Sequence, residues 1–582
     1  MSKKLLVVFC NIFITSCFSQ YNYKLWSTYY FGIDTKTSDA KLDSEGNLVV
    51  AGTTFLQQPA EYYETFTTMG CHQSSFEGTM ANGFICKFSS GGNLLWATYY
   101  GNNNTAIFGL ALDSANNIYV VGGTSAETGI ATPDAFIVHN ETASRKGFLS
   151  KFDTEGQLIW GTYFPAPISA ICITGNDEIF VTGDNDLNDP DNYIATLDGW
   201  QPTWSTYTDV ESGFANNING FINKFDTSGS RLAGTFIGHV YGGNNYITSD
   251  DNGDVYVSNL IIDTYAPSGF YASAGCHQAI IGGAEDIVIS KFNSSLNQRI
   301  WSTYYGGSSY DSCSGLMIKN ETLYVVGNTL SAINISSTGS FQPQINGFAD
   351  GFLATFDLSG QRIWSTYFGG EAFDSILGLD VSNSHIIIAG QTTSVQSIAV
   401  DSAYQESIIN DEGYIEVFTL SGLREWGTYF GGERSDNVKK VLASNDIILI
   451  AGDTNSTSGI STAQSAQSAL SMGSYTGTEN FTNMYLATLS SVDLGLTTKG
   501  KIQLKLSPNP NNGLFELEGM ESLDEFRLII YDNLDREILW EKSTVVGTSA
   551  VPFDFTGRLA AGSYFLKVST NNQDSVLKFI VY

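Results

Sequence analysis

The sequence is poor in positive charge and in histidine. Its 582 residues include 28 Lys and Arg against 59 Asp and Glu, so the formal net charge at pH 7 is −31. A chain with this charge repels phosphates, and no cluster of Lys and Arg offsets the repulsion, which excludes nucleic acid as a partner. The 5 His leave little room for histidine-based acid–base catalysis.

Cysteine is too scarce for a fold that depends on disulfides. Five cysteines follow residue 19, which is an odd number, and their spacing fits no metal cluster. A chain of this length builds a core that does not need disulfides, even in an oxidising compartment. We expect small buried thiols at these positions: Cys71, Cys86, Cys172, Cys276 and Cys313.

Long hydrophobic runs are also missing, so we expect no transmembrane segment. Residues 1–19 read as a signal peptide, because two lysines precede the apolar run 5–14, which is too short to cross a bilayer. Gln20 is then the first residue of the mature chain. The sequence Ile-Thr-Ser-Cys that ends at Cys17 also resembles a lipobox, and lipidation of Cys17 stays open as the alternative.

A short phrase, Leu-Trp-Ser-Thr-Tyr-Tyr in its first copy, recurs along the chain at intervals of about 60 to 70 residues, and a period of this length indicates a repeat fold. The copies are centred on Trp26, Trp96, Trp160, Ala233, Trp301, Trp364 and Trp426. Because Ala233 stands where the other copies have Trp, we expect the outer strand of that repeat to pack less tightly.

Each repeat contains four strand-like phrases that are apolar on both faces, as at 48–52 and 386–390. Such strands are buried on both sides. Asp-x-x-Gly turns, as at 153–156, fit tight hairpins. Residues 20–490 therefore predict an all-β fold, a seven-bladed β-propeller, and they resemble the bacterial seven-bladed propeller repeats of exported proteins.

The two ends of the repeated region predict how the ring closes. The strand at Trp26 has no preceding strand of its own repeat, and the strand 483–489 has no Trp strand after it. Pairing of these N- and C-terminal strands completes one shared blade and removes two exposed sheet edges.

Long segments fall between the second and third strands of each repeat. Short turns join the other hairpins, so these loops and the crossovers between repeats share one face of the ring. Recognition usually resides in loops on a rigid scaffold, and we expect an extracellular ligand, a glycan or a protein, to bind there. The segments are 54–82, 124–146, 184–219, 259–285, 329–350, 392–412 and 454–482.

A Gly-Gly-x-x-x-Asp phrase at three crossovers ends at Asp311, Asp374 and Asp436. Carboxylates at equivalent positions could ring the channel and hold a cation. The alternative is that each Asp bonds the backbone of its own turn. Identical spacing in successive repeats favours the second interpretation, because a role in every blade is usually construction of the blade.

Two other motifs suggest metal only superficially. Cys-His pairs occur at 71–72 and 276–277, but the equivalent positions of other repeats hold Trp200 and Phe341, which cannot be ligands. We interpret this position as a plug at the base of the loop. The oxygen-rich stretch 184–192 lacks the Gly and Glu of a calcium loop, which favours a solvated loop. No residue is therefore assigned to catalysis, to a cofactor or to a metal.

Enzyme motifs are absent or incomplete. A sialidase site needs an Arg cluster, but four of the propeller arginines share one repeat position and are scaffold: Arg231, Arg299, Arg362 and Arg424. Only Arg145 and Arg434 are left, too few for a clamp of three. No Gly-x-Ser-x-Gly elbow or His-Glu-x-x-His motif occurs. Paired carboxylates for polysaccharide cleavage stay open, because the sequence does not place two of them at a stated separation.

The last eighty residues differ from the repeats. Residues 491–502 are rich in Ser, Thr, Gly and Lys and read as a linker. Short strands in 503–582 predict a small Ig-like β-sandwich. Its Pro-Asn-Pro opening at 508–510, its Ala-Gly-x-Tyr strand and its Lys-x-Ile-Val finish resemble the type A C-terminal sorting domain of the type IX secretion system of Bacteroidota.

This resemblance implies a partner and a destination. The type IX secretion machinery would recognise residues 503–582 and carry the chain across the outer membrane, with cleavage near Lys499 and release or attachment at the surface. An N-terminal lipid on Cys17 would compete with that route. The sequence thus predicts a secreted or cell-surface, non-catalytic binding or adhesion module. The alternative is a polysaccharide-active enzyme, a glycoside hydrolase or lyase, with a carboxylate site on the loop face.

Overall fold

The structure is a computed structural model, and it describes most of the chain from residue 20 onward. The described residues are 20–30, 34–55, 67–140, 146–185, 193–208, 215–216, 218–243, 245–262, 269–401, 403–444, 447–462, 465–468, 482–492, 505–507, 511–518, 525–532, 537–544, 550–569 and 574–581. The predicted signal peptide, Cys17 and most of the predicted linker, with Lys499, lie outside them. Strand β30 extends to Val492, so the first two predicted linker residues belong to a strand.

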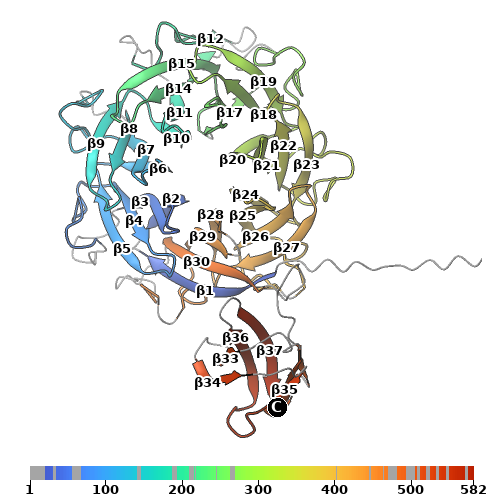
Figure 1. Ribbon diagram of the computed structural model, residues 1–582. Coiled ribbons are helices and arrows are strands. Elements are labelled where there is room, and N and C mark those ends of the chain that lie inside the picture. The colour runs from blue at the N-terminus through green and yellow to red at the C-terminus, as the bar shows by residue number, and fades with distance from the viewer. Residues whose placement is uncertain are drawn as a thin grey trace, which may run out of the picture. The chain divides into compact units, whose positions relative to one another are not determined.

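The chain divides into two compact units, of which one is Tyr21–Ser490 and the other contains Ser491–Tyr582. The first unit is a ring of seven four-stranded antiparallel sheets, each running from an inner strand a to an outer strand d (Figure 1). Among the described residues all regular elements are strands, which confirms the all-β prediction.

The strands of the blades are given from the axis outward. Blade 1 contains β2 (Thr35–Leu42), β3 (Leu48–Phe55), β4 (Ala81–Phe88) and β5 (Leu94–Tyr100). Blade 2 contains β6 (Ala106–Leu112), β7 (Ile118–Thr124), β8 (Lys146–Phe152) and β9 (Leu158–Phe164). Blade 3 contains β10 (Ile168–Ile173), β11 (Ile179–Asn185), β14 (Asn219–Phe225) and β15 (Arg231–His239), with the small hairpin β12 (Tyr207–Thr208) and β13 (Ala215–Asn216) in its b–c loop. Blade 4 contains β16 (Tyr246–Ser249), β17 (Val255–Ile262), β18 (Glu285–Phe292) and β19 (Arg299–Tyr305).

The remaining blades follow the same order. Blade 5 contains β20 (Asp311–Lys319), β21 (Thr322–Thr329), β22 (Asp350–Asp357) and β23 (Arg362–Phe368). Blade 6 contains β24 (Asp374–Val381), β25 (His385–Thr392), β26 (Glu412–Thr419) and β27 (Arg424–Phe430). Blade 7 contains β28 (Asp436–Ser444), β29 (Ile447–Thr454), β30 (Asn483–Val492) and β1 (Gln20–Tyr30).

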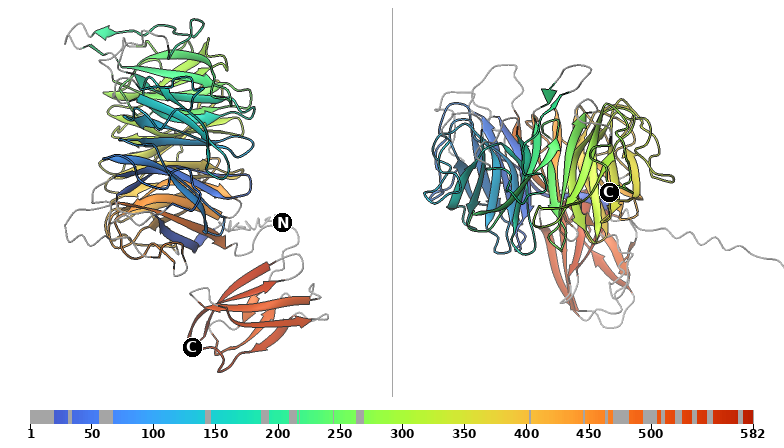
Figure 2. Two further views of the ribbon diagram at one scale, coloured as in Figure 1. Left: turned by 90° about the vertical axis from the view of Figure 1, so that its left-hand side faces the viewer. Right: turned by 90° about the horizontal axis from the view of Figure 1, so that it is seen from above.

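The inner strands line the axis and touch in sequence. Strand β2 contacts β6, and the series continues through β10, β16, β20, β24 and β28, which contacts β2 again. Figure 2 turns the ring edge-on and shows the sheets lying against one another. Strands such as β4 and β7 are buried along their whole length, because each sheet is covered by a neighbour on both faces.

Pairing of the first and last strands of the repeated region closes the ring. Strand β1 lies beside β30 and becomes the outer strand of blade 7. The b–c loop of that blade adds further bonds, since the Thr462 amide donates to Ser27 O at 2.9 Å and the Tyr29 amide donates to Gln467 O at 3.2 Å. The predicted closure is therefore confirmed: β30 has a strand neighbour on both sides, and bonds from the b–c loop cover part of the outer edge of β1.

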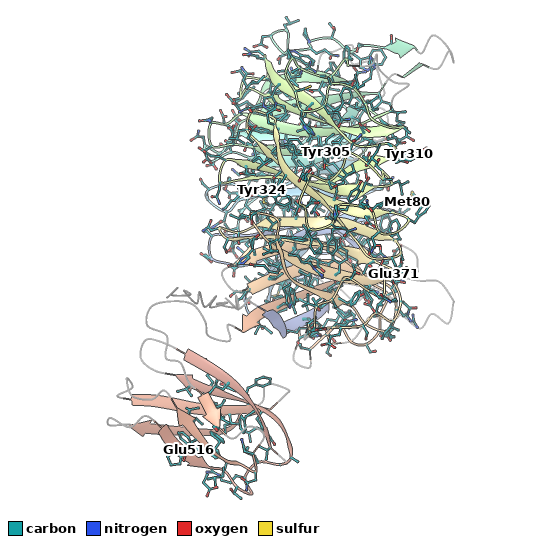
Figure 3. The ribbon with its side chains drawn as sticks, turned by 90° about the vertical axis from the view of Figure 1, so that its right-hand side faces the viewer. Met80, Tyr305, Tyr310, Tyr324, Glu371 and Glu516 are labelled. Atoms are coloured by element: carbon teal, nitrogen blue, oxygen red, sulfur yellow. The ribbon has the colours of Figure 1, made fainter. Side chains whose placement is uncertain are left out.

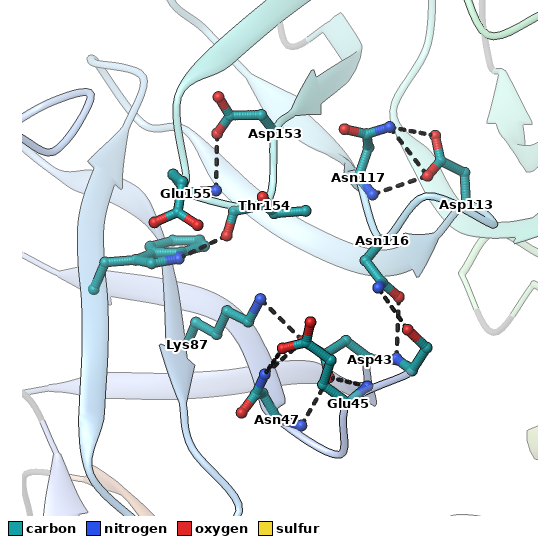
Figure 4. A network of polar contacts seen from close by, with 12 residues as sticks. Asp43, Glu45, Asn47, Lys87, Asp113, Asn116, Asn117, Asp153, Thr154 and Glu155 are labelled. Carbon is teal, nitrogen blue, oxygen red and sulfur yellow. Dashed lines mark hydrogen bonds and ion pairs between the residues drawn. The ribbon is translucent and has the colours of Figure 1, made fainter.

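The repeated tryptophan joins each blade to the next. The indole Nε1 of Trp96 donates to Thr154 O at 3.0 Å, in the c–d turn of the following blade (Figure 4). Gly156 of that turn has φ 78° and lies against the flat face of the Trp96 indole. Four further indoles make the same bond at 2.9 to 3.3 Å: Trp26 to Ser90, Trp160 to Thr227, Trp301 to Leu358 and Trp364 to Leu420.

The repeat without tryptophan is filled in another way. Ala233 and Leu296 lie in one buried cluster, and Leu296 occupies the turn position that is Gly in the other blades. Leu296 is 0% exposed, and its carbonyl accepts a hydrogen bond from the Trp200 amide at 2.9 Å. The looser packing that the sequence predicts at Ala233 is therefore not seen.

The a–b turns lie on the face of the ring opposite the long b–c loops, and several of them hold a buried ion pair. Asp43 accepts hydrogen bonds from the amides of Glu45 and Asn47, and Lys87 Nζ lies 2.9 Å from its Oδ2 (Figure 4). Burial opposes the charge of Asp43, but these bonds and the lysine hold its pKa below the usual range. Equivalent pairs in blades 2 and 4 are Lys151 with Asp113 and Lys291 with Asp250. In blade 3 Thr174 takes the place of the aspartate, and Lys224 pairs with the partly exposed Glu178 of the same turn.

The second unit is a two-sheet sandwich. One sheet contains β31 (Lys505–Ser507), β32 (Leu514–Glu518) and β35 (Ala550–Asp554), and the other contains β33 (Glu525–Asp532), β34 (Glu537–Thr544), β36 (Gly562–Ser569) and β37 (Asp574–Val581). Phe515 of the first sheet and Ile530, Leu566 and Phe579 of the second share one buried core. In the described part of the chain, no helix has the length and apolarity to cross a membrane.

Candidate binding face

The long b–c loops and the crossovers between blades lie on one face of the ring, which we call the mouth face. The b–c loops occupy 56–80, 125–145, 186–218, 263–284, 330–349, 393–411 and 455–482, close to the predicted segments. Figure 3 shows Met80, Tyr310 and Glu371 at this face and Tyr324 toward the opposite one. The geometry below concerns the described parts of these loops.

A glutamine in six of the seven loops fastens the loop to the outer strand, and Ile137 takes its place in blade 2. The Gln342 amide donates to Thr366 Oγ1 at 2.9 Å, and the Tyr367 amide donates to Gln342 O at 3.1 Å. Its side chain bridges inward, because Nε2 donates to Asp350 at 2.6 Å and Oε1 accepts from the Gly369 amide at 3.0 Å. The sequence shows this glutamine in the repeated plug motif, but spacing alone did not reveal its bridging role.

The residue before that glutamine fills the base of the loop. His72 meets Phe152 edge-on with ring centroids 5.7 Å apart, and Phe341 meets Phe418 in the same way at 5.8 Å. His277 packs on the equivalent phenylalanine of its neighbouring blade, and burial lowers its pKa to about 4. Aromatic packing of this kind fits the plug interpretation of the Cys-His pairs.

The crossover aspartates bond their own turns and do not project into the channel. Asp374 is 0% exposed and accepts hydrogen bonds from the Gly370 amide at 2.7 Å, the Ser394 hydroxyl at 2.8 Å and the Thr392 hydroxyl. Asp311 and Asp436 have the same arrangement with Gly307 and Gly432. The channel-ring interpretation of these three residues is therefore wrong, because their oxygens are already engaged inside the blade.

Three further buried carboxyls were not found from the sequence. Asp286, Asp350 and Glu412 occupy the same position at the start of strand c in blades 4, 5 and 6, and each is 0% exposed. Burial and, to a smaller extent, the neighbouring Asp374 together raise the pKa of Asp350 to about 6. Burial and Asp436 raise the pKa of Glu412 to about 8. Each of these three carboxyls is paired with the aspartate of the next crossover, as Asp350 is with Asp374. Only the register of strand c against the crossover brings the two together.

The arginines of the repeat position are scaffold, as predicted. Arg299 lies over the Trp200 ring at 4.5 Å, Arg231 over Phe136 at 5.1 Å and Arg424 over Phe341 at 5.6 Å. They hold loop bases, and none is free to clamp a substrate carboxylate. Arg145 lies outside the described residues.

The metal motifs gain no support from the described residues, among which no group of three or more His, Cys, Asp or Glu is placed to hold a metal ion. Asp184 accepts from the Gly243 amide at 3.1 Å and from Asn245 Nδ2 at 3.0 Å. It therefore serves the crossover, while residues 186–192 of the calcium-like stretch lie outside the described residues. All five cysteines are free; Cys86 and Cys313 are buried as expected, and the other three are only half-buried.

Blades 4 to 6 expose aromatic side chains at the mouth face. Tyr310 is 50% exposed, Phe348 78% and Phe373 46%. Their backbones are fixed, since the Phe348 amide donates to Ala372 O at 3.2 Å and the Leu330 amide to Tyr310 O at 2.9 Å. We call these three residues the aromatic set. Exposed aliphatic residues of the same loops and crossovers are Ile280, Ile333, Val395 and Ile409.

Known proteins resemble the repeated region only distantly. The regulatory protein FlaEY of Caulobacter vibrioides is 22% identical over 365 residues, which cover 60% of this chain and 36% of that protein, so the chain spans about a third of that relative. The endosialidase of phage phi92 is 10% identical with a TM-score of 0.36, covering 95% of this chain and 87% of that one. A sialidase of Trypanosoma rangeli is 9% identical with a TM-score of 0.31, covering 95% and 84%. These likenesses assign no activity to this chain.

The C-terminal unit has a specific match. Residues 505–582 match the family model described as the secretion system C-terminal sorting domain. The match covers the strands β31 to β37 of the two-sheet sandwich. Such a domain interacts with the secretion machinery. The protein therefore carries a secretion-system C-terminal sorting domain and is exported to the cell surface or secreted.

Proposed function

We propose that this protein is a non-catalytic binding or adhesion module that acts outside the cell and binds a glycan through the mouth face of blades 4 to 6. The aromatic set is the observation that carries the proposal. Aromatic faces stack on the apolar faces of sugar rings, and Tyr310 adds a hydroxyl for a hydrogen bond. Large apolar side chains that stay exposed on a rigid surface mark a site of interaction.

The rigidity of the surface supports binding. The aromatic set lies on crossovers and loop ends that are tied to their blades by backbone bonds, including the bridge between Ala349 and Phe373. A surface that is ordered before the ligand arrives loses little conformational entropy on binding. The negative charge of the chain disfavours polyanionic ligands, so a neutral glycan fits best.

The alternative, a polysaccharide-active enzyme, needs two accessible carboxyls about 5 to 10 Å apart. The paired carboxyls of the mouth face are instead fully buried and bonded to loop amides, as at Asp286 and Asp350. A buried carboxyl does not reach a glycosidic bond. This burial favours binding over cleavage for these residues.

Delivery completes the proposed function. We infer that the type IX secretion machinery recognises the sorting domain, that the signal peptide first directs the chain across the inner membrane, and that the domain is then removed. The propeller would remain as the mature, surface-attached or released part.

A glycan array tests the binding function with the full chain. We expect binding that falls at least tenfold in the double variant Phe348→Ala and Phe373→Ala, with an unchanged melting temperature. Ile159→Ala is the matched control, because Ile159 is a 48% exposed residue at the start of an outer strand, remote from the b–c loops in its blade. Binding that survives the double variant would refute this site. Products released from a bound glycan would establish the enzyme instead, and binding to a protein alone would replace the glycan.

A further inference from the structure

Six buried carboxyls at the mouth face of blades 4 to 6 form three pairs for which the described residues provide no compensating cation. Each pair joins a carboxyl at the start of strand c to the Asp of the next crossover. The pairs are Asp286 with Asp311, Asp350 with Asp374, and Glu412 with Asp436, and all six side chains are at most 1% exposed. Among the described residues, none of the six has a Lys or Arg nitrogen within 4.0 Å. Two like charges buried together are unfavourable unless a proton or a cation joins them.

The hydrogen bonds of Asp374 identify it as the ionised member of its pair. Gly370 and Ser394 donate to Oδ2, and Thr392 donates to Oδ1. Three donors stabilise the charged form of the Asp374 carboxyl, and a carboxylate has no proton of its own that would need an acceptor. Both lone pairs of Oδ2 are occupied by these bonds.

The hydrogen bonds of Asp350 differ between its two oxygens. Oδ2 accepts from Gln342 Nε2 at 2.6 Å and from the Asn346 amide at 2.9 Å. Oδ1 is buried and has no hydrogen-bond partner. A Cβ added to Gly369 would lie 2.6 Å from this oxygen and 2.9 Å from Asp374 Oδ2, so the two carboxyls face the same glycine. Asp286 Oδ1 and Glu412 Oε2 are also buried without a partner, and in the third pair Asp436 Oδ1 is buried without one as well.

Other blades of the same chain show what belongs at this position. Asn82 stands at the start of strand c in blade 1, where its Oδ1 accepts from the Glu77 amide at 2.7 Å. Its Nδ2 donates to Glu77 O at 2.7 Å and to Ala81 O at 2.9 Å. In blade 3, Asn219 Nδ2 donates to Ser205 O at 2.8 Å. The position therefore needs a donor on one atom and an acceptor on the other, which a protonated carboxyl supplies and a carboxylate does not.

The crossover partner changes together with this residue. Asn82 is followed by Thr105, whose amide donates to Ala81 O at 3.1 Å, just as the Asp374 amide donates to Ala349 O at 2.9 Å. In blades 1, 3 and 7 a neutral residue at the start of strand c thus has a neutral partner, and in blades 4 to 6 an acid has an acid; blade 2 differs, with Lys146 at this position. The neutral pairs are Asn82 with Thr105, Asn219 with Asn245, and Asn483 with Thr35.

A metal ion fits these pairs less well than a proton. Calcium requires six to eight oxygen ligands. Asp374 Oδ2 has no free lone pair, which leaves Asp350 Oδ1 as the one unengaged carboxylate oxygen on the shared glycine. A single proton on that oxygen removes the second negative charge of the pair without further ligands.

We propose that Asp286, Asp350 and Glu412 are held as neutral carboxylic acids beside ionised crossover aspartates, and that their deprotonation loosens the mouth face of blades 4 to 6 as the pH rises. The inference is independent of whether that face binds a glycan. It concerns the residues that join each b–c loop to the following crossover.

The surrounding charges agree with this assignment. Burial raises the pKa of Asp286 and of Asp350 to about 6 and that of Glu412 to about 8, with the paired aspartate as a further cause. Burial also raises the pKa of the crossover partners, that of Asp436 to about 6, while the hydrogen bonds they accept lower it. The other titratable groups that interact with the pairs are neutral tyrosines or further acids. The tyrosines are Tyr29, Tyr305, Tyr367, Tyr414, Tyr429 and Tyr485, and the acids are Glu371 and Glu416 near Asp374 and Glu433 near Asp436. A folded-state pKa above that of the unfolded chain means that the folded chain binds more protons. Stability from these groups is therefore present at acid pH and is lost as the pH rises through about 6 to 8.

The test uses the full chain and the combined variant Asp286→Asn, Asp350→Asn and Glu412→Gln. We expect the melting temperature of the unmodified protein to fall between about pH 5.5 and 8.5, and that of the variant to stay level and to exceed it at the higher pH. The matched control is Asp374→Asn, which removes the ionised partner and should lower the melting temperature at both pH values. Glu412→Gln alone serves if the combined variant does not fold, because the Glu412 pKa of about 8 places most of the effect in this pH range.

Three results would overturn the proposal. One is a variant that keeps the pH slope of the unmodified protein, and another is a variant that melts lower at the higher pH. The third is a rise in melting temperature with millimolar calcium that the variant loses, which would establish a cation in place of the proton. Hydrogen exchange gives a second readout: after correction for intrinsic rates, segments 342–350 and 369–374 should gain exchange with pH, and segment 73–82 of blade 1 should not.

Discussion

The indole of Trp96 lies flat against Gly156 of the next blade. A Cβ added to Gly156 would come within 2.7 Å of the ring, and Nε1 donates to Thr154 O in the same turn. The glycine therefore serves two purposes, since its φ of 78° closes the turn and its missing side chain admits the ring. This contact recurs between most neighbouring blades and joins them at the rim.

Gly156→Ala should lower the free energy of unfolding by about 2 to 4 kcal/mol, because a left-handed backbone and an overpacked indole add together. Gly46→Ala is the matched control. Gly46 has φ 81° in an equivalent Asp-x-x-Gly turn, but an added Cβ there meets nothing within 4 Å. We expect about 1 kcal/mol from that variant, measured by urea unfolding. Equal losses in the two variants would show that the indole contact contributes nothing.

Ala233 takes the position of the Trp of the other repeats, and Leu296 takes the position of the Gly that the Trp contacts. Ala233→Trp alone should cost about 1 to 3 kcal/mol, because Leu296 already fills the space. Leu296→Gly alone should cost about 2 to 4 kcal/mol through the cavity that it leaves. The double variant recreates the common pair, and we expect it to unfold closer to the unmodified protein than either single variant. Additive losses in this cycle would mean that the two positions are not coupled.

The repeats reveal the ring because its construction is local. A Trp strand, an Asp-x-x-Gly turn and a doubly buried strand each carry a pattern in consecutive residues, and the unpaired phrases at Trp26 and 483–489 imply their pairing. The compensation by Leu296 is different. It lies in another blade from Ala233, and a Leu in a turn with φ 57° is not what turn chemistry favours.

The mouth face could be located from loop length, but its chemistry could not. Asp350 and Asp374 are separated by a hairpin, and their contact follows from the register of strand c against the crossover. The exposed state of Phe348 likewise carries no sequence signature, because buried and exposed phenylalanines occur in similar apolar contexts along the repeats. The sequence did identify the repeated crossover aspartates. Of its two interpretations, the geometry supports the one in which each aspartate bonds its own turn.

Glu433 should stabilise the crossover into blade 7 at neutral pH. Its carboxylate accepts from the amides and hydroxyls of Thr457 and Ser458 at 2.5 to 2.9 Å, and these bonds lower its pKa to about 2 despite some desolvation. A depressed folded-state pKa gives stability above the unfolded pKa that is lost as the pH falls toward 2.

Glu433→Gln should therefore cost about 1 kcal/mol at pH 7, a value reduced for solvent screening, and less at pH 3. Glu371→Gln is the matched control. Glu371 follows a Gly-Gly pair in the same way, but among the described residues it accepts a single hydrogen bond, from the Val395 amide at 2.9 Å. Urea unfolding at both pH values measures the difference. A loss for Glu433→Gln that is equal at pH 7 and pH 3 would contradict an ionic contribution.

Removal of the sorting domain should change where the protein is found in the cell, but not the fold of the propeller. Removal of 505–582 leaves the strands of the propeller intact, including the closing pair β1 and β30, so the shortened chain should keep its melting transition. It should lose export, because the segment that the secretion machinery recognises is gone. Cell fractionation with immunodetection of the propeller measures this, and we expect accumulation inside the cell envelope with little protein at the surface or in the medium. Phe579→Ala, which opens a cavity in the sandwich core, should reduce export in the same way through loss of the folded domain. Normal surface delivery of the shortened chain would show that another part of the protein carries the address.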